Sequence, residues 1–132
     1  MVYTPQGPQR IVCLTEETTE TIYLLGEQRR IVGISGFTVR PPQARHEKPR
    51  VSAFTSAKID KILDLKPDLV FGFSDLQADI CQALVKAGLN VHIFNHRSVI
   101  GIFDMIATVG AIVQATDRST RSEEHTSELQ SH

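Results

Sequence analysis

The segment KIDKILDLKPDLVFGF, residues 58–73, decides the fold class. Its first half carries three apolar side chains at the spacing of one helix face: Ile59, Ile62 and Leu63. Because Pro67 excludes Lys66 from the helical region, the predicted helix must end there. The apolar run Leu69–Phe73 shows no alternation, which is typical of a strand covered on both faces. The segment therefore predicts a helix that feeds a central strand of a layered α/β domain.

The same alternation of apolar runs and helical patterns continues on both sides of this segment. Three more buried strands are predicted over Ile11–Leu14, Ile31–Ser35 and Val91–Phe94. Strands separated by helices imply parallel pairing with right-handed crossovers. We therefore predict a Rossmann-like, three-layer α/β lobe with a parallel four-stranded sheet that is covered by helices on both faces.

The helices are marked by caps and by apolar spacing. Thr15 is the predicted N-cap of a helix that runs to Leu25, and Gly26 supplies its left-handed C-cap. Ser56 or Thr55 is the predicted cap of the helix in the opening segment. Two later helices are marked by apolar residues at helical spacing: Ile80, Leu84 and Val85, then Val99, Ile102, Phe103, Ile106, Val109 and Val113. Residues 36–50 are predicted to be irregular because Pro41, Pro42 and Pro49 interrupt them.

Composition excludes several classes of function. The chain has 132 residues and a formal net charge of −1, with no basic face for nucleic acid and no apolar run long enough to cross a membrane. Cys13 and Cys81 are predicted to be small buried residues rather than a disulfide or metal ligands. His46, His92 and His96 lack the spacing of metal ligands, and the chain has no GxGxxG or phosphate-binding loop. The sequence offers no recognisable Ser/His/Asp or Cys/His combination for catalysis, and neither a metal nor a cofactor is expected.

Five loops are expected at the carboxyl ends of the predicted strands, where open α/β sheets bind ligands. They are residues 15–17, 36–38, 53–55, 73–75 and 94–96, and four of them contain a phenylalanine. Taken alone, any one of these phenylalanines is better explained as a residue of the hydrophobic core. Four of them at strand ends also suit a large flat ligand, because burying each aromatic face contributes about 1.5–3 kcal/mol.

Three stretches carry a resemblance to a known family: residues 10–44, residues 49–73 and residues 83–94. In this order and spacing they resemble the N-terminal lobe of the cobalamin and ferric-siderophore substrate-binding proteins of ABC importers, over about residues 10–115. The Leu-Lys-Pro-Asp-Leu-Val segment at residues 65–70 is frequent in that family. Among ligand classes, the resemblance is greatest to the cobalamin binders.

The resemblance implies two α/β lobes joined by one long helix, with a ligand held between them. It places Phe37, Phe54 and Phe73 where cobalamin binders have cleft aromatics, several of which are Tyr or Trp in the family. Residues of the same strand-end loops complete the predicted ligand-binding set: Thr15, Glu16, Thr38 and Ser74. Asp60 falls where the family has an exposed acid that docks on the permease, although a solvated helix face explains it equally well.

The resemblance also implies the partners and location of the protein. A corrinoid would be the transported ligand, and a permease and ATPase complex would receive it from a monomeric, non-catalytic binding protein. The family is periplasmic, whereas no secretory signal is visible after Met1, so an authentic start would predict a cytoplasmic chain. The ligand class stays open between a corrinoid, a ferric siderophore and haem.

The two ends of the chain are interpreted separately from the lobe. Residues 1–9 are an N-terminal extension, 10–118 form the N-terminal lobe, and 119–132 are a non-native tail, because RSEEHTSELQSH at 121–132 resembles a translated sequencing-library adapter. The second lobe would then be missing, and the connecting helix would stop near its beginning.

The sequence leaves open one alternative from another functional class, namely a small Rossmann-like enzyme or regulatory domain. A phosphoacceptor of that kind needs acidic residues clustered at its strand ends, and a flavin domain needs a phosphate-binding loop. The chain shows neither feature.

Overall fold

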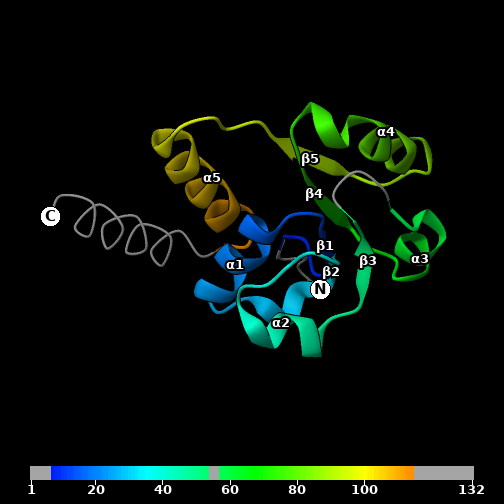
Figure 1. Ribbon diagram of the computed structural model, residues 1–132, viewed down its shortest axis with the longest axis horizontal. Coiled ribbons are helices and arrows are strands. Elements are labelled where there is room, and N and C mark those ends of the chain that lie inside the picture. The colour runs from blue at the N-terminus through cyan, green and yellow to red at the C-terminus, as the bar shows by residue number, and fades with distance from the viewer. Residues whose placement is uncertain (1–6, 54–56, 115–132) are drawn as a thin grey trace, which may run out of the picture.

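A five-stranded parallel sheet organises the part of the chain that the computed structural model describes, residues 7–53 and 57–114 (Figure 1). Its strands are β1 (Ile11–Cys13), β2 (Ile31–Ser35), β3 (Arg50–Ser52), β4 (Leu69–Phe73) and β5 (Val91–Phe94). They lie in the order β3-β2-β1-β4-β5, and every neighbouring pair is parallel. The first strand of the sequence therefore occupies the centre of the sheet.

The predicted strands are confirmed, but the four-stranded sheet is wrong because β3 adds an edge strand. β3 is only three residues long and includes the exposed Arg50, so it lacks the uniform apolar run that identifies the other strands. Its central residue, Val51, is fully buried. Residues 36–50 are also not irregular throughout, because they contain a short helix that begins at Pro42. Proline is well tolerated in the first turn of a helix, where its missing N–H has no partner to lose.

The described residues form five helices, of which the first four connect successive strands and the fifth follows β5. They are α1 (Glu16–Leu24), α2 (Pro42–Glu47), α3 (Ile59–Asp64), α4 (Ala78–Lys86) and α5 (Val99–Ile112), with short 3₁₀ turns at η1 (Gln28–Arg30) and η2 (Asp75–Gln77). Within these residues, no helix combines the length and apolar character that a membrane span requires.

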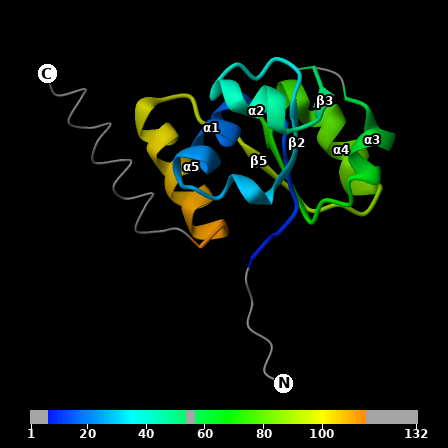
Figure 2. The ribbon, with the colours of Figure 1, turned by 90° about the horizontal axis from the view of Figure 1, so that it is seen from below.

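The helices cover both faces of the sheet, as the uniform strands predict. Ile11 and Cys13 of β1 point into a core cluster with residues of α1 and α5, including Ile22 and Val109. The alternate residues of the same strand enter a second cluster with residues of α3 and α4, among them Val12. Figure 2 shows α1 and α5 on one side of the sheet and α3 and α4 on the other.

The ends of the helices show which caps the sequence predicts correctly. Thr15 is the N-cap of α1, and its side chain accepts a hydrogen bond from the Thr18 N–H. Gly26 has a φ of +73°, as a left-handed C-cap requires. The cap of α3 is Lys58, which makes no side-chain capping bond, while the predicted caps Thr55 and Ser56 lie outside the described residues. α3 ends before Lys66, whose φ of +52° places it in the left-handed region.

Candidate functional site

The strand order brings the loops after the strands to one edge of the sheet and creates a switch point there. From β1 the chain crosses to β2 on one side, whereas from β4 it crosses to β5 on the other side. The connecting helices α1 and α4 accordingly lie on opposite faces. Open parallel sheets form their ligand crevice outside such a switch point. The candidate site is therefore the strand-end edge around β1 and β4.

Gln77 joins the ends of these two strands. Its side chain is fully buried. Its Nε2 donates to the Leu14 carbonyl oxygen at 3.0 Å, and its Oε1 accepts from the Phe73 N–H at 2.8 Å. Space behind it is tight, because a Cβ added at Gly72 would lie 2.7 Å from the Cys81 Sγ and 3.6 Å from the Gln77 Oε1. Sequence reasoning missed Gln77, and no pattern around it signals a buried amide.

Glu16 joins the loops that follow β1 and β2. Its carboxylate accepts from the Val39 N–H at 2.6 Å and from the Arg40 N–H at 3.2 Å. The hydrogen bond from the Val39 N–H is the main cause that holds the Glu16 pKa below its usual 4.5, and the Arg40 bonds act in the same direction, against the smaller effect of burial. In the structure the Glu16 carboxylate braces the loop that follows β2, and its predicted contact with a ligand stays a prediction.

Replacing Glu16 by glutamine should change how stability depends on pH. A carboxylate whose pKa falls on folding stabilises the folded chain above the unfolded pKa, and that contribution is lost as the pH falls through the lower folded value. We expect the wild-type chain to be more stable than Glu16→Gln in urea titrations at about pH 6, with the difference shrinking below 4.5. The matched control is Glu17→Gln, an exposed neighbour in the first turn of α1. A difference that stays constant with pH would contradict this role.

The three predicted hydroxyl contacts are bonded within their own loops. Thr15 is almost fully buried, and its Oγ1 lies 2.8 Å from the Thr18 Oγ1. Thr38 is fully buried, with its Oγ1 2.6 Å from the Ser35 Oγ. Ser74 has a φ of +59° and accepts from the Leu76 N–H at 3.1 Å. These hydroxyls shape the loops, and their direct contact with a ligand stays a prediction.

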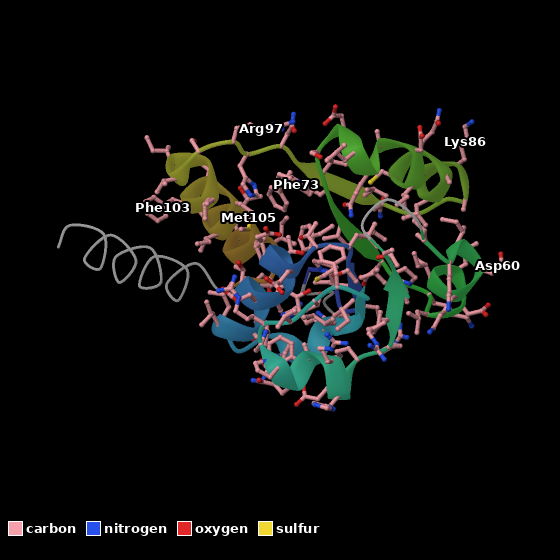
Figure 3. The ribbon with its side chains drawn as sticks, in the orientation of Figure 1. Asp60, Phe73, Lys86, Arg97, Phe103 and Met105 are labelled. Carbon is pink, nitrogen blue, oxygen red and sulfur yellow. The ribbon has the colours of Figure 1, made fainter. Side chains whose placement is uncertain are left out.

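The candidate aromatic residues lie on loops on either side of β1. Phe37 follows β2 and is 38% exposed, which is high for a ring of this size. Phe73 ends β4, is half-buried, and packs against the His96 ring with 4.8 Å between centroids. It points toward the side of α5 that carries Met105 (Figure 3). Phe54 lies outside the described residues. The structure thus adds His96, which sequence reasoning dismissed as a metal ligand, as a neighbour of a candidate site residue.

The remaining predicted features are an exposed acidic residue and two buried thiols. Asp60 is exposed in the first turn of α3, on the far side of the sheet from α5 (Figure 3). Cys13 and Cys81 are both buried free thiols, and burial raises the pKa of Cys13 to about 12. No cluster of three or more His, Cys, Asp or Glu residues able to hold a metal ion occurs among residues 7–53 and 57–114.

Comparison with known proteins points to a single family. The family profile described as "Periplasmic binding protein" matches residues 11–131. A vitamin B12-binding protein of Vibrio cholerae is 38% identical over 69 residues, which cover 52% of this chain and 25% of that protein. The chain thus spans only about a quarter of this curated relative.

Two solved structures share the fold. The periplasmic vitamin B12-binding protein of Vibrio cholerae superposes with a TM-score of 0.83 at 23% identity, over 96% of this chain and 50% of that one. A periplasmic haem-binding protein from Pseudomonas aeruginosa gives a TM-score of 0.82 at 21% identity, over 92% of this chain and 44% of that one. At these identities the likeness concerns the fold alone.

Proposed function

Because this chain belongs to the periplasmic binding protein family, we propose that it forms one lobe of the solute-binding component of an ABC uptake system. In this proposal the complete protein has a second α/β lobe, and it holds cobalamin or a related corrinoid between the two. The family consists of solute-binding proteins rather than enzymes. The alternative of a small Rossmann-like enzyme or regulatory domain is therefore set aside.

The observation that carries the proposal is the pair of phenylalanines at the strand-end edge. Phe37, in the loop after β2, remains 38% exposed, and Phe73, at the end of β4, remains half-buried, although the apolar residues within β2 and β4 are mostly covered. A rigid flat macrocycle placed over this edge would bury both rings. One of the curated relatives that match the chain is a vitamin B12-binding protein, which favours a corrinoid.

A ferric siderophore or haem is the alternative ligand for the same edge. Haem is also flat and largely apolar, and the imidazole of His96 packs against Phe73 at this edge in a tilted arrangement. The two ligand classes are separated by titrating cobalamin, haem and a ferric siderophore into the complete protein in parallel. Tight binding of haem or the siderophore, with no cobalamin binding at high micromolar concentration, would overturn the corrinoid assignment and keep the transport class.

The proposal extends to the partners and the location of the complete protein. Asp60, exposed in the first turn of α3, would dock on basic residues of the permease. Delivery to a permease and its ATPase places a monomeric binding protein on the outer side of the cytoplasmic membrane, in the periplasm. The candidate ligand contacts would then comprise the three phenylalanines and four residues of the strand-end loops: Phe37, Phe54, Phe73, Thr15, Glu16, Thr38 and Ser74.

Replacing Phe73 by alanine in the complete protein should weaken cobalamin binding by about ten- to a hundredfold. The ring supplies apolar area that the ligand would cover, and alanine removes nearly all of that area. Isothermal titration calorimetry measures the effect directly. Phe103→Ala is the matched control, because Phe103 projects from the opposite side of α5 (Figure 3). Equal affinities for the Phe73 variant and the wild-type protein would refute the proposed site.

A further inference from the structure

A basic cavity of about 680 Å³ lies beside the edge strand β3, separate from the Phe73 side of the strand-end edge. Five cationic residues line it: Arg45, Lys48, Arg50, Lys58 and Lys61. They come from α2, β3, α3 and the connections around them. Among residues 7–53 and 57–114, no acidic residue lines this cavity. Three consecutive elements of the chain therefore bring like charges to one cavity.

The concentration of charge is unusual for this chain. Five of its fourteen Lys and Arg residues line this one cavity, although the whole chain has a formal net charge of −1. None of the five forms an ion pair with a carboxylate of residues 7–53 or 57–114. The Lys61 ammonium donates to the Arg50 carbonyl oxygen at 3.0 Å, which brings its charge toward β3. Glu47 is close enough to act on the charge of Lys48, but it forms no ion pair with it. Like charges gathered without paired carboxylates repel one another, and a bound anion would relieve this repulsion.

Partial burial makes the positive charge of one lining residue less stable when no anion is near it. Lys48 is half-buried, and desolvation lowers the pKa of its ammonium below the usual 10.5. A nearby anion would stabilise the charged form of this side chain. Lysine and arginine side chains converging on one point also match the chemistry by which proteins recognise phosphate groups.

We propose that the cavity beside β3 binds the phosphate groups of an anionic ligand. The ligand class is a polyvalent phosphate, either a small soluble polyphosphate or the phosphate headgroups of an anionic lipid surface. The proposal does not depend on the corrinoid site, because none of the five cationic residues that line the cavity belongs to the candidate ligand contacts. Cobalamin affinity is therefore expected to be unchanged by substitutions in the cavity.

A competing explanation is that the charges only protect the edge of the sheet. Unpaired edge strands invite pairing with another chain, and exposed lysine or arginine on them discourages it. Arg50 would serve that purpose as the exposed residue of β3. This explanation needs no bound anion, and it predicts that removing the charges increases self-association without changing the binding of any phosphate.

The test uses the full 132-residue chain and two probes at low ionic strength. Tripolyphosphate is titrated by calorimetry, and vesicles containing phosphatidylglycerol are tested by co-sedimentation. Removing one cavity charge with Lys58→Gln should weaken binding of the effective probe by about three- to tenfold. The matched control is Lys86→Gln, an equal change of charge at the exposed end of α4 (Figure 3), which should leave binding unchanged. Arg45→Gln provides a second cavity variant.

Each outcome decides the proposal. Tripolyphosphate binding that is weakened only by the cavity variants supports it with a soluble ligand, and the same pattern on vesicles alone supports it with a lipid source. The proposal is overturned if neither probe binds, or if Lys86→Gln weakens binding as much as Lys58→Gln. It is also overturned if the cavity variants merely self-associate while binding is unchanged.

Discussion

Replacing Phe71 by alanine is expected to lower the free energy of unfolding by about 3–5 kcal/mol, the largest effect that we predict for a single substitution. Phe71 is fully buried in the middle of β4, with β1 and β5 paired on either side of it. Its ring packs against Phe94 with 5.6 Å between centroids and against the edge of His92 at 6.1 Å. Alanine would leave a cavity that paired strands on both sides cannot close.

The measurement is a urea titration of the full chain followed by circular dichroism. Because domains of this kind have stabilities of about 5–15 kcal/mol, the loss would be a large part of the total. Phe37→Ala is the matched control, since it removes the same ring from a position that is 38% exposed. We expect that variant to lose about 1 kcal/mol or less. Similar losses for the two variants would contradict the placement of Phe71 in the core.

Replacing Gln77 by leucine should cost about 2–5 kcal/mol, because it leaves a buried backbone carbonyl and a partly buried backbone N–H without the partners seen here. Leucine has a similar volume but supplies neither the donor to the Leu14 carbonyl oxygen nor the acceptor for the Phe73 N–H. The loss should therefore reflect hydrogen bonding rather than a cavity. The predicted effect is concentrated where the ends of β1 and β4 meet.

Two measurements separate this effect from a general loss of stability. Urea titration compares Gln77→Leu with Gln82→Leu, the same substitution at an exposed position of α4, which should be nearly neutral. Hydrogen exchange of the Phe73 amide should be slow in the wild-type chain and faster in Gln77→Leu under strongly native conditions. Unchanged protection of that amide would show that Gln77 does not secure the end of β4.

The sequence predicts most clearly the strands that are central in the sheet, because both of their faces are buried. β1 and β4 lie between other strands and under helices on both faces, so their residues are uniformly apolar. β3 escapes prediction because an edge strand of three residues needs only one fully buried apolar side chain, Val51. α2 escapes it because Ala44 is its one buried residue, which leaves no apolar stripe to recognise.

The candidate site was predictable in its location but not in its internal bonding. Parallel strands must place their carboxyl ends at one edge, and so the loops containing Phe37 and Phe73 follow from the strand pattern. The role of Gln77 does not, because it depends on the turn at Ser74, whose φ of +59° redirects the chain so that the amide is buried. Asp75 and Asp79 on either side are exposed, and they give the segment the appearance of a solvated helix start.

The central position of β1 has a consequence for how the protein is made. β1 is synthesised before β2 and β4, the two strands that finally flank it. On the ribosome, β1 can pair with β2 early, but its second edge stays open until the polypeptide has been extended through β4. An open edge of an apolar strand is a template for pairing with other chains. The nascent chain is therefore most exposed to misassembly while residues between β3 and β4 are being added, and this is the interval in which a chaperone would have the most to protect.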